Sequence, residues 1–253
     1  MLYAGIDIGS TAAKAVLIDE SKTRILTRIL MPSGWNSKDT AESILNQILS
    51  EGYSRDEMRI TATGYGRVSV PYADNTLTEI TCHGKGAAFL GGDNLTVIDI
   101  GGQDTKVIVI VNGRVVDFVM NDKCSAGTGK FLEVMANRMG LTLQEFFSFA
   151  ERGRDIKISS MCTVFAESEI VSLMGLGTPR EDIACGAVGS VVSKVASLVS
   201  RKNSHADTKF FLTGGFCESA FMIRKLSEGL NAEVSTTPDA RYAGAIGAAL
   251  LGK

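Results

Sequence analysis

The first third of the chain and its middle share one pattern of apolar runs separated by short polar turns. Runs of this kind, bounded by Gly, Asp, Ser and Asn, are typical of β-strands joined by tight turns. The strands expected are Leu2–Ile8, Ala13–Ile18 and Arg24–Met31, then Leu95–Gly101, Val107–Val111 and Arg114–Met120. Because the second set follows the first by about ninety residues with similar turn residues, the pattern indicates an internal duplication at domain scale.

Segments in which apolar residues recur every three or four positions predict helices. Asp39-Thr40-Ala41-Glu42 and Thr142-Leu143-Gln144-Glu145 have the capping-box pattern, and Thr178-Pro179-Arg180-Glu181 combines a threonine N-cap with proline in the first turn. Two further segments, Glu79–Leu90 and Tyr242–Leu250, are rich in small residues. We therefore expect these two helices to cross closely, at a hinge.

Each copy of the repeat places an aspartate-containing turn after its first strand. The two turns are Asp7-Ile8-Gly9-Ser10-Thr11 and Asp99-Ile100-Gly101-Gly102-Gln103-Asp104. Glycine allows close backbone approach, turn N–H and hydroxyl groups can cradle a phosphate, and Asp7 at the strand end can hold a hydrated metal ion. One such turn alone is also compatible with an ordinary hairpin. Two in one chain predict a nucleotide gripped from both sides of a cleft, with Thr213-Gly214-Gly215 lying against a base or ribose.

Two cysteines precede predicted helices. Cys124 lies ahead of Phe131–Met139, and Cys162 lies ahead of Val164–Met174. The N-terminus of a helix favours a thiolate or an anionic cluster. A cubane iron–sulfur cluster usually needs four cysteines, so two copies of the chain around a twofold axis would supply the required number.

The other three cysteines, Cys82, Cys185 and Cys217, lie in small-residue or apolar settings, where a free cysteine packs as a small hydrophobic residue. The alternative, a cluster contained within each subunit, would recruit its third and fourth ligands from these three. Iron counting on single cysteine variants separates the two arrangements.

Composition narrows the environment of the protein. The 253 residues carry a formal net charge of -2, which gives no reason to expect nucleic acid or an anionic membrane as a partner. No apolar run approaches the roughly 20 residues of a membrane span. We expect no export signal, because the start is strand-like with no basic segment ahead of it, and five scattered cysteines argue against a disulfide framework. We therefore expect a protein of the reducing cytoplasm.

The two Asp-x-Gly turns, the Thr-Gly-Gly turn and the two small-residue helices, in this order, resemble the nucleotide-binding superfamily of actin, hexokinase and the heat-shock chaperone ATPases. The resemblance implies an α/β fold of the duplicated actin-like (ribonuclease H-like) ATPase type, with two domains around a cleft for Mg-ATP. The first domain would comprise residues 1–94 and 238–253. The second, residues 95–237, would carry the cluster-binding helices.

Within that superfamily, the whole chain is most similar to activators of 2-hydroxyacyl-CoA dehydratases and benzoyl-CoA reductase ATPase subunits, the BadF/BadG/BcrA/BcrD type. The most specific marks are Ala62-Thr63-Gly64-Tyr65-Gly66-Arg67, Glu79-Ile80-Thr81-Cys82-His83, Asp99–Asp104, Lys123–Gly129 and Met161–Glu169. The resemblance implies a homodimer bridged by one [4Fe–4S] cluster, with Cys124 and Cys162 as its ligands in each chain. ATP hydrolysis would drive one electron to a dehydratase or reductase, and a ferredoxin- or flavodoxin-type protein would supply that electron.

The resemblance also assigns roles to single residues. Asp7 and Asp99 would hold Mg²⁺, Gln103 would orient the attacking water, and Asp104 would assist. The phosphates would be bound by Gly9, Ser10, Thr11, Lys14, Gly101, Gly102 and Gln103. Gly127, Thr128 and Gly129 would approach the ribose or phosphates, and Gly214 and Gly215 would contact the adenosine.

Two other functions are compatible with the same fold. A small-molecule kinase of the pantothenate or acetate type would use the same phosphate turns, and its cysteines would be incidental. An actin-like filament or nucleotide-switched scaffold would need no chemistry beyond the nucleotide. The pair of cysteines ahead of helices favours the electron activator over both.

Overall fold

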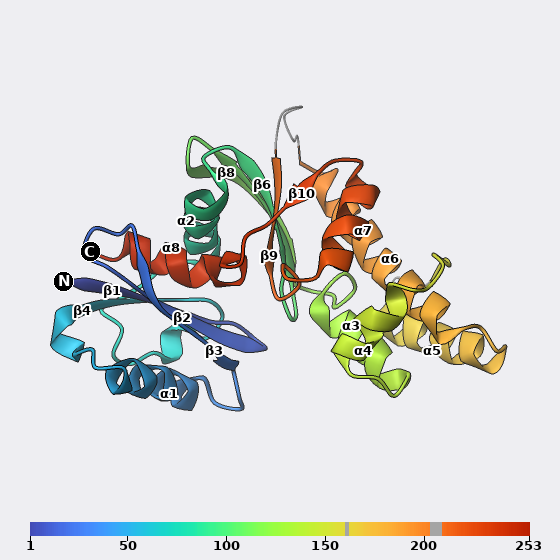
Figure 1. Ribbon diagram of the computed structural model, residues 1–253, viewed down its shortest axis with the longest axis horizontal. Helices are drawn as coiled ribbons and strands as arrows, with labels where there is room; N and C mark the ends of the chain where they lie inside the picture. Colours follow the sequence, from blue (N-terminus) through green and yellow to red (C-terminus); the bar gives the residue numbers. More distant parts are fainter. Residues whose placement is uncertain (160–161, 203–208) are drawn as a thin grey trace. The chain divides into compact units, whose positions relative to one another are not determined.

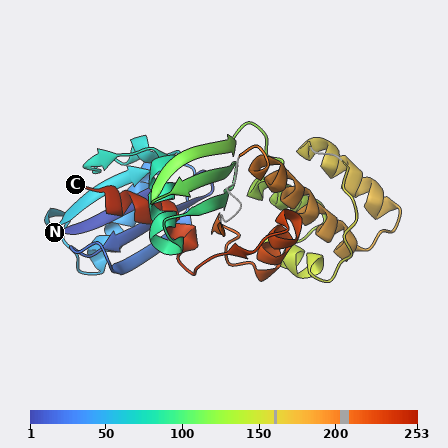
Figure 2. The same ribbon diagram turned by 90° about the horizontal axis from the view of Figure 1, so that it is seen from above.

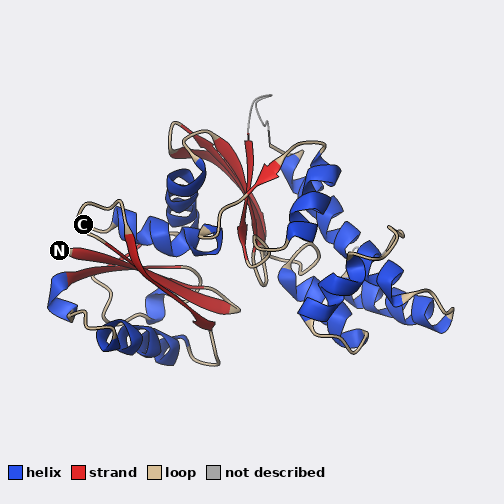
Figure 3. Ribbon diagram, viewed as in Figure 1, coloured by secondary structure: helices blue, strands red, loops and turns tan. Residues whose placement is uncertain are grey.

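The computed structural model describes residues 1–159, 162–202 and 209–253, so Ser160 and Met161 of the predicted cysteine motif lie outside the described residues. This part of the chain contains both helices and strands, in runs of up to three consecutive strands and four consecutive α-helices (Figure 3). The strands are β1 (Leu2–Ile8), β2 (Ala12–Ile18), β3 (Ile25–Pro32), β4 (Met58–Thr63), β5 (Asn75–Thr76), β6 (Leu95–Ile100), β7 (Thr105–Val111), β8 (Arg114–Asn121), β9 (Lys209–Gly214) and β10 (Val234–Ser235). The α-helices are α1 (Ser37–Ser50), α2 (Glu79–Gly91), α3 (Gly129–Arg138), α4 (Leu143–Ala150), α5 (Thr163–Gly175), α6 (Arg180–Val199), α7 (Ala220–Leu230) and α8 (Ala243–Leu251).

The strands form two sheets with the same succession. One has the order β3-β2-β1-β4-β5, and the other, counted from its far edge, has the order β8-β7-β6-β9-β10. In the first sheet, β2 is antiparallel to β1 and β3, while β4 is parallel to β1. All six strands expected for the repeat are present, and the matching strand orders confirm the duplication and the α/β class.

The chain divides into two compact units. Unit 1 comprises Met1–Val97, Ile108–Phe118 and Thr236–Lys253, and unit 2 comprises Ile98–Val107 and Val119–Ser235. The domain boundaries expected from the sequence, 1–94 with 238–253 and 95–237, stay a prediction.

The first sheet of unit 1 has a helix on each face (Figure 1). On one face, Ile44 and Ile48 of α1 pack in a buried cluster with Ile6 and Ile8 of β1. On the other face, α8 residues, including Ile246, pack in a second cluster with strand residues of the sheet. Because β1 is covered on both faces, Asp7 at its end is only 5% exposed.

Helices α2 and α8 cross with their backbones in contact (Figure 2). A Cβ atom added to Gly86 would lie 1.9 Å from the Ala243 carbonyl oxygen, and one added to Gly247 would lie 1.7 Å from the Cys82 carbonyl oxygen. No side chain fits at either position. The close crossing predicted from the small residues of these helices is therefore confirmed, while the hinge stays a prediction.

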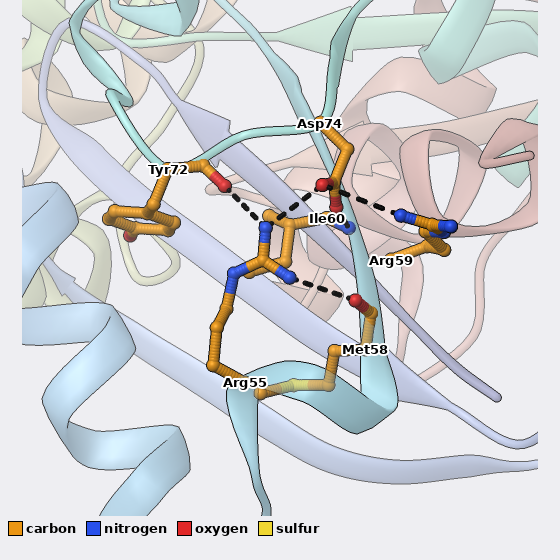
Figure 4. A network of polar contacts seen from close by, with 6 residues as sticks. All are labelled: Arg55, Met58, Arg59, Ile60, Tyr72 and Asp74. Atoms are coloured by element: carbon orange, nitrogen blue, oxygen red, sulfur yellow. Dashed lines mark hydrogen bonds and ion pairs between the residues drawn. The ribbon is translucent and has the colours of Figure 1, made fainter.

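An arginine fastens the edge of the first sheet (Figure 4). The guanidinium of Arg55 donates to the carbonyl oxygens of Met58 (3.0 Å) and Tyr72 (2.9 Å) and to Asp74 Oδ1 (2.9 Å). The other carboxylate oxygen of Asp74 accepts the backbone N–H of Ile60 at 2.7 Å. These bonds hold the short segment before β5 against β4, the strand that ends beside Asp7.

Two of the three predicted helix-capping patterns are wrong in detail. Helix α1 is capped by the side chain of Asn36, which accepts the Lys38 N–H, so Asp39 lies inside the first turn and is not the cap. Helix α6 begins at Arg180 with Pro179 as its N-cap, one residue later than the threonine cap predicted at Thr178. The capping box between Thr142 and Glu145 is confirmed, with both reciprocal hydrogen bonds present.

The sequence predicts no apolar run long enough to span a membrane, and helix α6 differs from that expectation. By length and composition alone, Arg180–Val199 is apolar enough to cross a membrane, but 67% of its apolar window is buried inside the protein. Val188, Val191 and Val195 are all fully buried. The helix is apolar because it is a core helix of unit 2.

Candidate functional site

The carboxylate of Asp7 lies in a tight backbone cradle in unit 1. A Cβ atom on Gly64 would lie 2.4 Å from Asp7 Oδ1, and one on Gly244 would lie 2.5 Å from Asp7 Oδ2. Gly64 has a φ of +83°, a conformation that favours glycine. Asp7 Oδ1 is buried and has no hydrogen-bond partner among the described residues. A buried carboxylate oxygen without a donor fits a cation or a cation-bound water.

The turn after Asp7 is closed by a backbone hydrogen bond and held by the side chain of Ser33. The Gly9 N–H donates to the Ala12 carbonyl at 3.2 Å, and the Ser33 hydroxyl donates to the Gly9 carbonyl at 2.6 Å. Ser10 and Thr11 are exposed. The Nζ atom of Lys14 would lie 3.6 Å from a Cβ on Gly9, so its ammonium group is beside the turn. Exposed hydroxyls and a nearby ammonium group can together bind an anion.

The second turn closes on itself in unit 2. The Gly101 N–H donates to the Asp104 carbonyl at 2.9 Å, and a Cβ on Gly101 would lie 2.4 Å from Asp104 Oδ1. Gly102 is half-buried, and the Gln103 side chain is exposed. The predicted water-orienting residue is therefore accessible, whereas the aspartate one position later points back over the turn.

Lys106 is a residue that the sequence reasoning missed. Its side chain is 2% exposed, and its Nζ atom lies 3.2 Å from Asp99 Oδ2 and 2.8 Å from Asp104 Oδ2. The remaining oxygen of Asp99, Oδ1, accepts the hydroxyl of Thr213 at 3.1 Å. One lysine thus joins two aspartates of the predicted site. The available signal was its spacing, because Lys106 follows Asp99 by the same seven residues that separate Lys14 from Asp7.

The glycine beside each aspartate is also duplicated. Gly214 has a φ of +84°, and a Cβ there would lie 2.8 Å from Asp99 Oδ1, much as Gly64 borders Asp7. Both glycines follow a threonine at the end of a strand, Thr63 in β4 and Thr213 in β9. Gly215, the second predicted adenosine contact, is exposed. The sequence reasoning used the second Thr-Gly pair and missed that the first is its counterpart.

The segment before α3 is bonded directly to the second turn. The N–H groups of Gly129 and Lys130 donate to the carbonyls of Gly101 (2.9 Å) and Gly102 (2.8 Å). The Thr105 hydroxyl, fully buried, donates to the carbonyl of Gly127 at 2.6 Å. Thr128, the N-cap of α3, is buried as well. The structure therefore brings the predicted Gly127–Gly129 contact residues together with the second turn.

Cys124 and Cys162 are the two exposed cysteines, and their neighbours touch. The hydroxyls of Ser125 and Thr163, the residues immediately after each cysteine, are 2.7 Å apart. Cys162 is the N-cap of α5, as predicted. Cys124 is not at a helix start, because a turn closed by the Thr128 N–H on the Ser125 carbonyl (3.1 Å) separates it from α3.

The other three cysteines are buried. Burial raises the pKa of the Cys82 thiol to about 11 and also raises the pKa of Cys185. Burial therefore disfavours the thiolate form of these two side chains. Among the described residues, no group of three or more His, Cys, Asp and Glu side chains is arranged to hold a metal ion. The part of the chain described here therefore offers the two exposed cysteines no third ligand of these kinds.

Comparison with known proteins identifies the family to which the chain belongs. The model of the BadF/BadG/BcrA/BcrD ATPase family matches residues 4–252. The chain belongs to this family. It is 42% identical over 249 residues to the (R)-2-hydroxyglutaryl-CoA dehydratase activating ATPase of Acidaminococcus fermentans, covering 97% of this chain and 95% of the relative. The family and its ATPase character, both predicted from the motifs, are confirmed.

Solved structures agree over the full length. Component A of the A. fermentans (R)-2-hydroxyglutaryl-CoA dehydratase matches with a TM-score of 0.93 and 40% identity, over 100% of this chain and 97% of that one. The activator of the 2-hydroxyisocaproyl-CoA dehydratase from Clostridium difficile, solved with bound ADPNP, matches with a TM-score of 0.91 and 36% identity, over 100% and 94%. A ROK family glucokinase from Streptomyces griseus, at 15% identity and a TM-score of 0.62 over 100% and 99%, shares the fold alone. The predicted actin- and hexokinase-like ATPase fold is confirmed.

Proposed function

We propose that this protein is an ATP-dependent one-electron activator. It would hydrolyse Mg-ATP and deliver one electron at low potential to an enzyme of the 2-hydroxyacyl-CoA dehydratase or benzoyl-CoA reductase type. The observation that carries the proposal is the pairing of Cys124 and Cys162, through Ser125 and Thr163, in the unit that also holds the second phosphate turn. Relatives that activate dehydratases support the choice of partner.

The nucleotide is bound by the two glycine turns. The N–H groups at Gly9–Thr11 and Gly101–Gln103 take the phosphates, with Lys14 as their cationic partner. Asp7, whose Oδ1 has no described donor, fits Mg²⁺ held through water, and Asp99 is the corresponding carboxylate of the second turn. Gln103 orients the attacking water with help from Asp104. Gly214 and Gly215 border the adenosine, and Gly127, Thr128 and Gly129 approach the ribose or phosphates.

The cysteines fit a shared cluster. Cys124 and Cys162 are exposed and linked through their neighbours, and neither has a third cysteine beside it among the described residues. A [4Fe–4S] cluster bound by two chains supplies a one-electron redox centre. In each chain, Asn121 orients the first cysteine loop by donating from Nδ2 to the carbonyls of Cys124 and Ala126, both at 2.8 Å.

Coupling has a short physical route in unit 2. The loop that carries Cys124 ends at Gly129, whose N–H is bonded to the second phosphate turn at Gly101. A shift of that turn on phosphate binding or release would be passed to Ser125–Thr128, the residues between Gly129 and Cys124. Thr105, the first residue of β7, holds the same loop through Gly127. Nucleotide state would thus alter the surroundings of the cysteine, which tune the potential of a cluster.

The remaining partners follow from this chemistry. The protein would act as a homodimer whose two chains share the cluster. It would work in a reducing cytoplasm, because an exposed cluster reacts with oxygen. A ferredoxin- or flavodoxin-type protein would reduce it, and the dehydratase or reductase would receive the electron. We expect no nucleic-acid or membrane partner.

Anaerobic purification with iron analysis tests the proposal. We expect a brown protein with about four irons per dimer. Cys124→Ser and Cys162→Ser should each lose the iron, whereas Cys185→Ser and Cys217→Ser, matched buried controls, should keep it. Asp7→Ala and Asp99→Ala should lose Mg-dependent ATP hydrolysis while retaining iron.

Other outcomes would point elsewhere. One cluster per chain, or iron loss in the Cys185 or Cys217 variant, would overturn the shared cluster. A colourless, iron-free preparation that phosphorylates a small acceptor would support a small-molecule kinase instead. Nucleotide-dependent filaments without iron would support an actin-like scaffold.

A further inference from the structure

Lys106 is a buried lysine between two carboxylates. Its side chain is 2% exposed, and its Nζ atom contacts Asp99 Oδ2 at 3.2 Å and Asp104 Oδ2 at 2.8 Å. Burying an ammonium group is costly unless nearby negative charge compensates it. Both carboxylates belong to the second phosphate turn, so this lysine is part of the turn's charge balance.

The corresponding lysine of the first turn has a different environment. Lys14 follows Asp7 by seven residues, as Lys106 follows Asp99, and Lys14 lies opposite Asp7 in the β1–β2 register. Among the described residues, Lys14 forms no ion pair with a carboxylate, and its Nζ lies beside Gly9. The duplicated lysines have therefore diverged: one faces the turn, and the other neutralises aspartates.

The two aspartates have diverged in parallel. Asp7 Oδ1 is buried with no described hydrogen-bond donor. Asp99 has donors on both oxygens, Thr213 on Oδ1 at 3.1 Å and Lys106 on Oδ2 at 3.2 Å. A divalent cation approaching the second turn would meet carboxylate oxygens that a tethered cation already occupies, whereas Asp7 beside the first turn has a carboxylate oxygen with no described donor.

We propose that Lys106 is a positioning residue that serves as the built-in counter-cation of the second turn. It holds Asp99 and Asp104 in place before nucleotide arrives, and it prevents a divalent cation from binding to them in the absence of phosphates. The inference rests on the proposed binding of Mg-ATP at this turn. Magnesium is usually held by one or two carboxylates together with substrate phosphates, so a competing ammonium makes metal binding depend on the nucleotide.

Metal binding without nucleotide tests this role. The probe is Mn²⁺, followed by the electron paramagnetic resonance signal of the free ion, with nucleotide-free protein. Lys106→Met leaves Asp99 and Asp104 without their cation and should bind Mn²⁺ about tenfold more tightly, or more, than the wild type. Adding Asp99→Asn to Lys106→Met should abolish the gain, and Lys106→Arg, which keeps the charge, should bind like the wild type.

Lys225 provides a matched control. It also lies between two carboxylates, with Asp155 at 3.0 Å and Glu228 at 3.4 Å, but those two side chains are 58% and 56% exposed. Lys225→Met removes a lysine from an equally acidic but hydrated setting, and Mn²⁺ binding should not change. Equal Mn²⁺ affinity in Lys106→Met and wild type would overturn the proposal and leave Lys106 with a purely structural role.

A second variant covers a folding failure. If Lys106→Met does not fold, a double variant replaces it. Lys106→Met/Asp104→Asn has one negative charge fewer at the turn than Lys106→Met, so it should fold while still binding Mn²⁺ more tightly than the wild type. Failure of this double variant to gain Mn²⁺ affinity would equally overturn the idea. The Mn²⁺ measurement needs neither ATP hydrolysis nor iron. The proposal for Lys106 can therefore fail while the proposed function stands, and the proposed function can fail while Mn²⁺ binding changes as expected.

Discussion

The hydroxyl of Ser125 lies 2.7 Å from the hydroxyl of Thr163. These residues are far apart in the sequence, and each directly follows one of the two exposed cysteines. A hydrogen bond at this point fixes the spacing between the Cys124 loop and the start of α5. The Ser125–Thr163 pair therefore positions the two proposed cluster ligands relative to each other, although neither residue is a ligand itself.

Removing this hydrogen bond should loosen the cluster. Ser125→Ala and Thr163→Val each delete one hydroxyl, and a net hydrogen bond is worth about 1 kcal/mol, or roughly fivefold in an equilibrium. We expect iron to be lost to a chelator several times faster from either variant. Ser43→Ala, whose hydroxyl bonds only within α1, is the control. Unchanged loss rates in both variants would show that the pair does not hold the cysteines.

The five thiols should fall into two classes of reactivity. In iron-free protein at pH 8, Cys124 and Cys162 should react rapidly with an aromatic disulfide reagent because they are exposed. Cys82, with a pKa raised by burial to about 11, carries roughly 0.1% thiolate at that pH and should react only on unfolding. Reconstituting the cluster should protect both fast thiols together. A third fast thiol would contradict the burial of Cys82, Cys185 and Cys217.

Alanine at the aspartate-bordering glycines should disturb the two turns that we propose to bind phosphate. A methyl group on Gly64 would lie 2.4 Å from Asp7 Oδ1, and one on Gly214 would lie 2.8 Å from Asp99 Oδ1. Gly52→Ala is the matched control, because Gly52 also has a positive φ (+93°) but nothing within 4 Å. We expect Gly52→Ala to cost about 1 kcal/mol of unfolding free energy and to leave ATP hydrolysis intact.

Gly64→Ala and Gly214→Ala should cost more in urea unfolding than Gly52→Ala. They should also lower the rate of ATP hydrolysis by roughly a hundredfold, since displacing a positioned group by about 1 Å has effects of that size. A rate of ATP hydrolysis equal to that of Gly52→Ala would show that Gly64 and Gly214 do not shape the proposed nucleotide site.

Asp182 should make the segment before Cys162 sensitive to acid. Its carboxylate accepts the backbone N–H of Arg154 at 2.8 Å and the guanidinium at 2.9 Å, and these bonds lower its pKa. A carboxyl group with a lowered pKa stabilises the fold above its unfolded pKa of 3.8, and this contribution is lost as the pH falls through the folded value.

Hydrogen exchange of residues 153–159 measures the effect. At pH 7, Asp182→Asn should exchange faster than the wild type, and the difference should shrink as the pH falls below about 4. Glu151→Gln is the control, because its ion pair with Arg224 is about half exposed on both sides. A difference that is constant with pH would exclude the charge of Asp182 as its cause.

The sequence was informative where a local pattern determined the structure. Strand β1 and its turn could be predicted because Leu2–Ile8 is apolar and Asp7-Ile8-Gly9 recurs at Asp99. The crossing of α2 and α8 followed from small residues at Gly86 and Gly247, which alone allow backbone contact.

The sequence failed where a partner from elsewhere decided the outcome. Lys106 appears in an apolar strand as an isolated charge, and only the structure brings Asp99 and Asp104 to it from β6 and the turn. The cap of α1 was misassigned because several polar residues precede that helix, and the backbone of Asn36, which is extended, selects it over Asp39.

The packing of α8 has a consequence for how the protein is made. Gly244 borders Asp7, and Lys22 donates to the carbonyls of Leu250 and Gly252. Helix α8 follows all of unit 2 in the chain, so the ribosome synthesises unit 2 before it completes the surroundings of Asp7. During synthesis, the second turn can form while the first still lacks one wall. The turn after Asp7 comes first in the sequence, but its surroundings are complete only after unit 2 has been synthesised.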